Sequence, residues 1–216
     1  MPKDIVLIGS GGHAKSVSSV ATSCGFNVIA YVDDDKAGEN IFEIPVISSS
    51  ECEQNYSSND FAIAIGDNAI REHVAKEYKA KFPNAKFPYL IHKSCIIDPH
   101  CKIMEGSVLM PLSNIGPGTN IGCFCIVNTH SSVDHDCNIN DYASLAPGVV
   151  LGGLVTIGLR SAISIGSTVK HNLTIGHDVV IGGNSYVNKK IKDNTVAYGT
   201  PCKKVSERKK FDPYLD

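Results

Sequence analysis

The sequence predicts two unlike domains: an α/β, Rossmann-like βαβ half-domain over residues 1–88 and an all-β parallel β-helix of hexapeptide repeats over residues 89–216. Two patterns carry this prediction. Aliphatic residues recur every six positions through the second half of the chain, and the first half opens with a buried-strand run that ends in a glycine-rich turn. A fixed repeat indicates stacked similar units, whereas strand, glycine turn and helix in that order indicate a nucleotide-binding unit.

The six-residue repeat keeps its phase over the whole second domain. Its large positions are Ile91, Ile97, Ile103, Leu109, Ile115, Ile121, Val127, Val133, Ile139, Leu145, Leu151, Ile157, Ile163, Val169, Ile175, Ile181 and Val187. Four residues later comes a mostly small residue, at Cys95, Cys101, Ser107, Ser113, Thr119, Cys125, Ser131, Cys137, Ala143, Ser161, Ser167 and Ser185. One large and one small inward residue per unit describe a short strand followed by a corner. We expect the cysteines of this set to fill the core as small apolar side chains.

Three such units make one turn of a triangular prism of parallel strands, the hexapeptide β-helix. Its eighteen-residue coils are expected to start at Ile91, Leu109, Val127, Leu145, Ile163 and Ile181. Helices of this class are left-handed, an exception to the right-handed crossover rule. The alternative, ordinary strands with accidental spacing, does not produce an unbroken phase of this length. The chain from Val205 onward carries no readable motif and is expected to form a tail.

Residues 1–88 are expected to alternate strands and helices. The predicted elements are a strand at 5–8, a glycine turn at 9–13, a helix from about Ala14 to Cys24, a strand at 28–32, a strand at 61–65 and a helix from about Ala69 to Phe82. Acidic residues 33–35 follow the second strand, and Gly66-Asp67-Asn68 follow the third. This order is typical of a nucleotide-binding βαβ unit, whose ligand lies at the carboxyl ends of the strands.

The glycine turn predicts a phosphate-binding loop. Gly9 and Gly11 fit the dinucleotide fingerprint, but Ala14 replaces its third glycine, and the domain is short for a whole dinucleotide. We therefore expect a half-sized fold that holds one nucleotide at a helix N-terminus; the alternative is a purely structural turn. His13 stands inside this loop, and its alternative role is that of a solvent-facing neighbour of the helix cap.

Composition excludes several classes of function. The chain has 20 basic and 22 acidic residues, so no surface for nucleic acid or for membrane phosphates is implied. The start MPKDIVLIGS lacks the features of a signal peptide, and no stretch approaches the ~20 apolar residues of a membrane span. We expect a cytoplasmic protein. Its eight cysteines include no CxxC pair, and we expect neither disulfides nor a bound metal.

One histidine of the repeat domain has the surroundings of a general base. His135 is flanked by Asp134 and Asp136, and a carboxylate on one ring nitrogen makes the other nitrogen more basic. Residues eighteen apart should stack ~4.8 Å from one another, one strand spacing per coil. This places Gly153 directly beside His135, with His171 one coil further on. A bare glycine backbone there suits an acetyl group, and its amide is a candidate oxyanion donor.

The motifs of this chain resemble those of the bacterial sugar O- and N-acetyltransferases of the sialic-acid and bacillosamine type. The resemblance covers nearly the whole chain and rests on GSGGHAK, YVDDD, AIGDNAIR, LIHKSC, VNTHSSVDHDC, APGVVLGG and YGTPCKK. It implies a homotrimer with each active site in the cleft between neighbouring β-helices. It also implies that His135 is the general base and that Asp136 supports it.

The resemblance implies binding residues as well. Gly11, Gly12 and His13 would hold the phosphates of a nucleotide sugar, Asp33 and Asp34 would meet the base or ribose, and Gly66 would line the same pocket. Acetyl-CoA would contact Ser144, Gly153, Ile165 and Gly183 along the outer wall of the coils. Many relatives have a histidine where this chain has Ser144, so this contact with the acetyl group is expected to be weaker or mediated by water.

The expected function is acetyl transfer from acetyl-CoA to the 4-amino group of a UDP-linked 4-amino-4,6-dideoxy sugar of the bacillosamine type, for surface glycans. The alternatives within the family are a sialic-acid O-acetyltransferase and an N-acetyltransferase of a dTDP- or GDP-linked amino sugar. Outside it stand a non-catalytic nucleotide-sugar sensor and a γ-class carbonic anhydrase. The latter needs three zinc ligands; His130 and His135 have the spacing of two, but Ser94 and Pro99 stand where the third would be.

Overall fold

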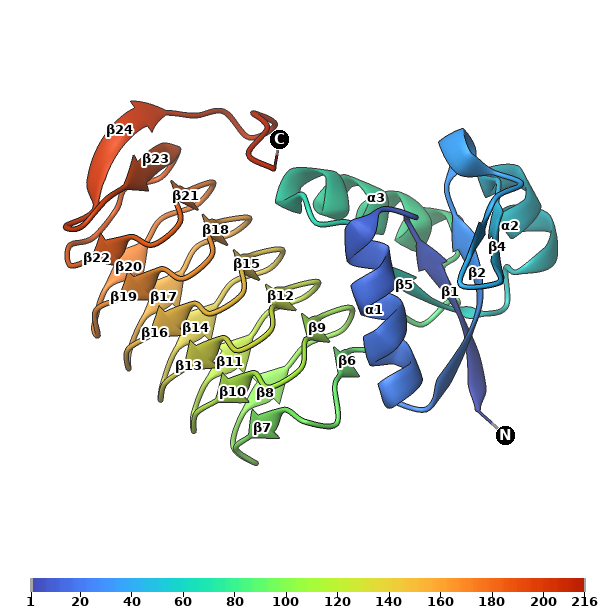
Figure 1. The fold of residues 1–216 in the computed structure, drawn as a ribbon, viewed down its shortest axis with the longest axis horizontal. Helices are drawn as coiled ribbons and strands as arrows, with labels where there is room; N and C mark the ends of the chain where they lie inside the picture. Colours follow the sequence, from blue (N-terminus) through green and yellow to red (C-terminus); the bar gives the residue numbers. More distant parts are fainter. Residues whose placement is uncertain (1, 216) are drawn as a thin grey trace.

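The computed structural model describes residues 2–215, which form an α/β domain beside a β-helix (Figure 1). The elements of the α/β domain are β1 (Lys3–Ile8), α1 (Gly12–Ser23), β2 (Phe26–Val32), η1 (Asp34–Lys36), β3 (Asn40–Ile41), β4 (Ile44–Ile47), α2 (Ser49–Asn55), β5 (Asp60–Ile63) and α3 (Asn68–Lys81). They build one sheet in the order β3-β4-β2-β1-β5, parallel except for the β3–β4 pair.

Side chains of the central strands alternate between the two faces of this sheet, because the period of a strand is two. Ile5 and Leu7 of β1 pack with the buried side of α1, whereas Val6 and Ile8 pack with α2 and α3. All four side chains are buried, as the apolar run at the start of the sequence predicts. The sheet is thus covered by helices on both faces.

The expected strands and helices of this domain are confirmed, but the segment between residues 40 and 55 was missed. There β3 and β4 form a hairpin whose two turn residues, Phe42 and Glu43, have φ angles of 50° and 67°. Such turns usually contain asparagine or glycine, so the sequence gives no signal for this one. Helix α2 follows at once, with the Ser48 hydroxyl accepting a hydrogen bond from the Glu51 amide.

The β-helix consists of two-residue strands with the predicted register of eighteen residues. They are β6 (Leu90–Ile91), β7 (Ile96–Ile97), β8 (Lys102–Ile103), β9 (Val108–Leu109), β10 (Asn114–Ile115), β11 (Asn120–Ile121), β12 (Ile126–Val127), β13 (Ser132–Val133), β14 (Asn138–Ile139), β15 (Ser144–Leu145), β16 (Val150–Leu151), β17 (Thr156–Ile157), β18 (Ala162–Ile163), β19 (Thr168–Val169), β20 (Thr174–Ile175), β21 (Val180–Ile181) and β22 (Tyr186–Val187). Every third strand stacks in parallel, giving the three walls of a left-handed prism.

The core of the prism contains the predicted residues. From Leu109 to Val187 the repeated aliphatic side chains are at most 1% exposed. The small inward residues do more than fill space, because their hydroxyl and thiol groups bond to the backbone of the next coil. Ser131 Oγ donates to the Ala146 carbonyl at 3.0 Å, and Cys125 Sγ donates to the Asn140 carbonyl at 3.1 Å. All eight cysteines are free.

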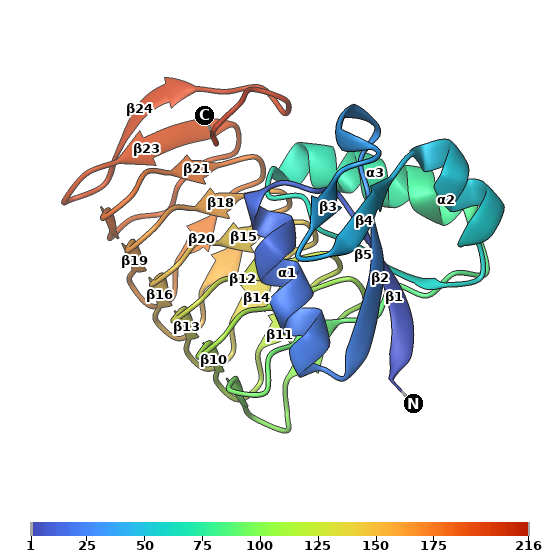
Figure 2. The ribbon, with the colours of Figure 1, turned by 45° about the vertical axis from the view of Figure 1, so that its right-hand side comes forward.

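The three walls have different surroundings. The α/β domain lies against the wall that contains β6, β9, β12, β15, β18 and β21, and the wall from β7 to β22 faces away from it in both views (Figures 1 and 2). Helix α1 packs on Leu90, Val108 and Met110 of the near wall.

The coils end in an antiparallel hairpin of β23 (Thr195–Tyr198) and β24 (Lys203–Glu207), after which the chain returns toward α3. Among residues 2–215 no helix is long and apolar enough to cross a membrane.

Candidate active site

A cavity of about 720 Å³ lies at the carboxyl ends of β1, β2 and β5, where a βαβ unit binds its ligand. All the residues predicted to bind the nucleotide sugar line it: Gly11, Gly12, His13, Asp33, Asp34 and Gly66. Gly11 is the N-cap of α1 and supplies no side-chain cap, so the first amides of the helix are available to an anion. A Cβ atom on Gly11 or on Gly12 would meet no protein atom within 4 Å. The protein itself therefore leaves room above these two residues.

The acidic residues after β2 are held by the chain at the rim of this cavity. Asp33 accepts hydrogen bonds from the Ser10 hydroxyl and, at 3.2 Å, from the Asp35 amide. Asp34 accepts from the Ser49 amide and hydroxyl, both at 2.7 Å. These bonds from the Ser49 backbone and side chain lower the pKa of Asp34. These bonds fix the two aspartates as an acidic edge of the cavity beside the glycine loop.

His13 is half-buried and lies between two cavities. Burial, assisted by the nearby charge of Arg71, lowers the pKa of His13 to about 4. The ring is therefore neutral at physiological pH, and its Nε2 atom is buried without a hydrogen-bond partner among residues 2–215. An unpartnered buried nitrogen at the edge of a ligand cavity is a ready contact for a bound substrate. The buried Nε2 atom argues against the alternative of a solvent-facing cap neighbour.

A second cavity, of about 360 Å³, lies between the α/β domain and the near wall of the β-helix. Ser144 and Ile165, two of the residues predicted to contact acetyl-CoA, line it. Its remaining lining is mostly apolar and includes Ile126, Ala146 and Ala162. His13, Gly66 and Leu215 line both this cavity and the larger one, so the two are neighbours across these three residues.

His135 has the surroundings predicted for it. Its Nδ1 lies 2.8 Å from Asp136 Oδ2, and its backbone amide donates to Asp134 Oδ1 at 2.8 Å. A carboxylate can only accept, so Nδ1 carries the proton and Nε2 is left with a free lone pair. The hydrogen bond to Asp136, and then the charges of Asp134 and Asp136, raise the pKa of His135.

The stacking of Gly153 beside His135 is confirmed. A Cβ atom at position 153 would lie 2.4 Å from His135 Nε2, so only glycine leaves space for the ring. The imidazole therefore lies over bare backbone, with half of its side-chain surface exposed. This corner follows β13 and β16 on the wall that faces away from the α/β domain.

One chain does not bring all the predicted residues together. His135, Asp136 and Gly153 form one group at the far corner, and none of them lines either cavity described above. Ser144 and Ile165 form a second group beside the α/β domain. Gly183 belongs to this second group, because a Cβ atom on it would lie 3.3 Å from Ile165 Cγ2. The residues expected to contact acetyl-CoA are thus divided between two edges of the β-helix.

No group of three or more histidine, cysteine or acidic side chains that could hold a metal ion occurs in the part of the chain that the structure describes. His130 follows β12 and His135 follows β13, so the two histidines occupy different corners of the prism. Their sequence spacing therefore does not place them at one zinc site within a single chain.

Comparison with known proteins decides the family. The PglD N-terminal domain matches residues 4–78. The acetyltransferase domain of PglB from Neisseria gonorrhoeae, which has also been solved with acetyl coenzyme A, is 30% identical to this chain. Its structure matches with a TM-score of 0.88 and covers 94% of this chain and 100% of that one. This chain belongs to the PglD-like sugar N-acetyltransferases.

Two further relatives of this acetyltransferase define its class of substrate. PerB from Caulobacter crescentus, solved in complex with CoA and GDP-perosamine, is 30% identical, with a TM-score of 0.89 over 95% of this chain and 99% of that one. The UDP-N-acetylbacillosamine N-acetyltransferase of Bacillus subtilis is 30% identical over 113 residues, which are 50% of this chain and 51% of that protein. The enzyme is an acetyl-CoA-dependent N-acetyltransferase of a nucleotide-linked amino sugar. The carbonic anhydrase and binding-module alternatives were therefore wrong.

Sequence reasoning missed a buried arginine that joins the two domains of this acetyltransferase. Arg71 of α3 is 1% exposed and donates hydrogen bonds to the carbonyls of Ile65 and Gly66 beside the nucleotide cavity. It also donates to the Phe124 and Tyr142 carbonyls of the β-helix. An arginine in a charged helix usually predicts an exposed face, so nothing in the local sequence distinguishes it. The tail residues Tyr214 and Leu215 were also missed, because no motif in the tail indicates their contacts.

Proposed function

We propose that this acetyltransferase transfers acetyl from acetyl-CoA to the 4-amino group of a UDP-linked 4-amino-4,6-dideoxy sugar of the bacillosamine type, with His135 as general base. The observation that carries the proposal is the Asp136–His135 pair, whose free Nε2 lies above the bare backbone of Gly153. A base whose pKa is raised by a carboxylate, beside an open backbone, suits direct attack on a thioester.

The larger cavity would hold the nucleotide. The amides at the start of α1 favour the diphosphate, as helix N-termini generally do, and Gly11 and Gly12 leave space for it. The acidic edge formed by Asp33 and Asp34 would accept hydrogen bonds from the ribose or base. Neutral His13 and Gly66 line the passage toward the β-helix, where the sugar would extend.

In the reaction, the neutral sugar amine attacks the thioester carbonyl carbon of acetyl-CoA. The electron-withdrawing oxygens of the sugar lower the pKa of this amine, so a neutral fraction exists near pH ~7–8. His135 Nε2 accepts the proton that the nitrogen loses, and the Gly153 amide stabilises the oxyanion. The tetrahedral intermediate then collapses, the C–S bond breaks, and the proton passes to the departing thiolate. The products are the N-acetyl sugar and CoA, without an acyl-enzyme.

A homotrimer would complete this site. The near wall of the β-helix is covered by the α/β domain of the same chain, and the wall from β8 to β20 exposes polar residues such as Asn120 and Asn138. The third wall instead exposes Ile96, Val150 and Tyr186, which are 70%, 43% and 39% exposed. These three side chains share the wall with the polar residues Asn114, Ser132 and Thr168, and exposed apolar side chains on one wall favour burial against another subunit. Acetyl-CoA in such a cleft would contact Gly153 of one chain and Ser144, Ile165 and Gly183 of another.

A second candidate is the same reaction on a GDP-linked amino sugar. It is favoured by the sequence match to the GDP-perosamine N-acetyltransferase of Escherichia coli O157:H7, which extends over 68% of this chain, whereas the sequence match to the UDP-N-acetylbacillosamine N-acetyltransferase extends over 50%. Both candidates use the same base and the same cavity. They differ only in the nucleobase that meets the acidic edge.

The test is a substrate panel. Purified enzyme and acetyl-CoA are incubated with UDP-, GDP- and dTDP-linked 4-amino sugars and with sialic acid, and CoA release is followed. We expect the highest kcat/KM with the UDP-linked sugar and a product whose mass is higher by one acetyl group. A higher kcat/KM with the GDP-linked sugar would select the second candidate, and turnover of sialic acid alone would overturn both.

A further inference from the structure

The C-terminal tail, residues 208–215, folds back from the end of the β-helix onto α3 and reaches the two cavities. Its first residue, Arg208, is buried, and its guanidinium donates to the Asp212 carbonyl at 2.7 Å. The Lys209 amide donates to Asp212 Oδ2 at 2.6 Å. These bonds form a compact turn that directs the last residues inward. The tail is therefore a folded element with its own contacts.

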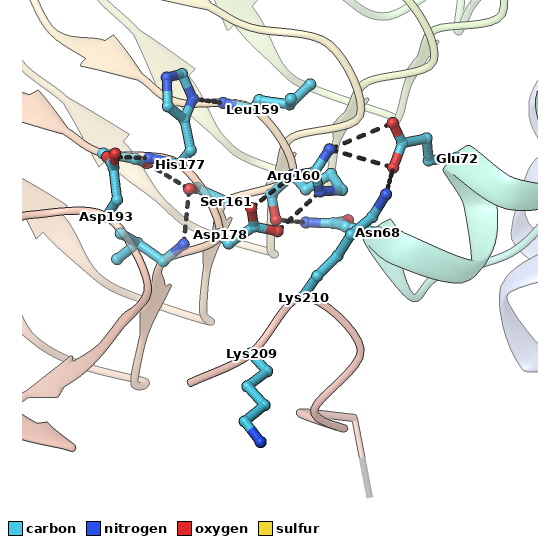
Figure 3. Close-up of polar contacts among 12 residues, drawn as sticks. Asn68, Glu72, Leu159, Arg160, Ser161, His177, Asp178, Asp193, Lys209 and Lys210 are labelled. Atoms are coloured by element: carbon cyan, nitrogen blue, oxygen red, sulfur yellow. Dashed lines mark hydrogen bonds and ion pairs between the residues drawn. The ribbon is translucent and has the colours of Figure 1, made fainter. Parts of the chain in front are cut away.

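An ion-pair network holds this turn against the body of the enzyme. Lys210 Nζ lies 2.6 Å from Glu72 Oε2 of α3, and Glu72 also pairs with Arg160 at 3.2 Å (Figure 3). Arg160 in turn pairs with Asp178 of the next coil at 2.6 Å. Burial raises the pKa of Glu72, but hydrogen bonds from Lys210 and Lys76 and the charge of Arg160 lower it to about 2. The Glu72 side chain is 6% exposed and the Lys210 side chain is 39% exposed, so the carboxylate is shielded from solvent and the ammonium only partly so.

Tyr214 binds the turn that precedes α3. The Asn68 amide has no acceptor within the helix, because it lies in the first turn of α3. It donates instead to Tyr214 Oη at 3.0 Å. The tyrosine hydroxyl also lies 3.5 Å from the Gly66 carbonyl. Both contacts fall on the segment whose Gly66 lines the nucleotide cavity. The tail and the glycine at the junction of the cavities are therefore held together.

Leu215 lies where the two cavities meet. It lines both of them, and Tyr214 lines the smaller one beside Ser144. A Cβ atom on Gly66 would lie 3.3 Å from Leu215 Cδ1, so the leucine side chain sits directly over this glycine. The leucine is nevertheless 62% exposed, which leaves an apolar surface open beside the path from the nucleotide to the β-helix.

We propose that Tyr214 and Leu215 form the wall that receives the sugar of the nucleotide sugar, and that the Lys210–Glu72 ion pair keeps this wall in place. Leu215 would touch the sugar itself, and Tyr214 and Lys210 would act as positioning residues. A methyl-bearing deoxy sugar suits such a wall, because its apolar face is buried against leucine without leaving a hydroxyl unpaired. The inference rests on the proposed function, since the nucleotide must occupy the larger cavity.

The test separates binding of the sugar from binding of the nucleotide. For Leu215→Ala, we expect the KM of the nucleotide sugar to rise about tenfold, as for lost apolar contacts in a specificity pocket. The Kd of the free nucleoside diphosphate and the KM of acetyl-CoA should stay at the values of the parent enzyme. Lys210→Ala should also raise the KM of the nucleotide sugar. Lys210→Arg keeps the positive charge and should have the KM of the parent enzyme.

Lys209→Ala is the matched control. Lys209 is the neighbour of Lys210 in the tail, but its side chain points away from Glu72 (Figure 3), and the variant should keep the kinetics of the parent enzyme. The variants are assayed with the nucleotide sugar that the parent enzyme acetylates. If the proposed nucleotide is wrong, the substrate panel on the parent enzyme shows it, whereas the KM values of the variants test only the wall. An unchanged KM of the nucleotide sugar in Leu215→Ala would contradict the proposed wall. Equal weakening of nucleotide sugar and free diphosphate would overturn it too, because the tail would then only support the nucleotide cavity.

Discussion

The nucleotide cavity and the His135 corner are built in opposite ways. One chain encloses the cavity on several sides with the glycine loop, the acidic edge and α3, and the two aspartates of its rim are already hydrogen-bonded to Ser10 and Ser49. The His135 corner is an open edge of the prism, with Asp136 as the only side chain bonded to the imidazole among the described residues. Under the proposed function, a single chain would therefore suffice to bind the nucleotide, whereas the chemistry would require a second surface.

His13 and His135 differ in a related way, in the direction in which their surroundings shift the pKa. Burial lowers the pKa of His13 to about 4, while the hydrogen bond to Asp136 raises the pKa of His135. At neutral pH the first is a neutral hydrogen-bonding group, and the second is the more basic imidazole of the two. Environments that separate the pKa values of like residues are a common way to assign them different roles. Under the proposed function, His13 would serve recognition and His135 would serve proton transfer.

The largest effect is expected from removing the base. His135→Ala should lower kcat by ~10²–10⁴-fold, the usual contribution of general base catalysis. Nucleotide-sugar and acetyl-CoA KM values should change little, because the ring contacts neither cavity in this chain. Steady-state kinetics of both substrates check this.

A covalent route would give a different result. Burial raises the pKa of Cys125 to about 12 and also raises that of Cys137, so both remain poorly nucleophilic thiols. A near-normal kcat for His135→Ala, or an acetyl-cysteine detected by mass spectrometry, would contradict the assignment of His135 as the base.

The next largest effect is expected from separating the subunits. Val150→Glu places a charge on the wall that exposes apolar residues, and sedimentation should show the trimer dissociating into monomers. Activity should fall by about 10²-fold or more, since the base would lose the surface that completes its site. The Kd of the nucleoside diphosphate should not change. Thr174→Glu, on the polar wall, is the matched control and should stay trimeric; a fully active Val150→Glu monomer would contradict the proposed cleft.

A smaller effect, confined to the nucleotide cavity, is expected from Gly11→Val. The protein leaves open space at this position, so the added side chain should not disturb the fold and should instead obstruct the phosphates. Hydrogen bonds to a charged group contribute ~1.5–3 kcal/mol, which predicts a rise in the KM of the nucleotide sugar of ~10–100-fold. The KM of acetyl-CoA should remain as in the parent. Equal loss of affinity for both substrates would mean that this cavity does not hold the acceptor.

The sequence predicted the β-helix in detail because its repeat is local. Each strand pairs with the strand eighteen residues away, so the large and small positions fix both register and core, and Gly153 beside His135 follows by counting. The tail could not be predicted in this way. Tyr214 meets Asn68 across 146 residues, and only the placement of the α/β domain on the near wall brings them together. Arg71 depends on the same placement, because two of its acceptors are carbonyls of the β-helix.

The smallest effect tests how Asp136 tunes the base. The pKa of His135 is raised by its hydrogen bond to Asp136, and only the neutral ring accepts a proton. The kcat of the parent enzyme should therefore increase with pH through one ionisation above ~6.5, the ordinary value for histidine, and then level off. Asp136→Asn removes the carboxylate that favours the protonated ring, so the midpoint should shift to lower pH. The plateau should fall by less than in His135→Ala, because a weaker and less firmly oriented base remains. Profiles of kcat against pH for both enzymes measure the shift, and coincident midpoints would show that Asp136 does not bond to His135 during turnover.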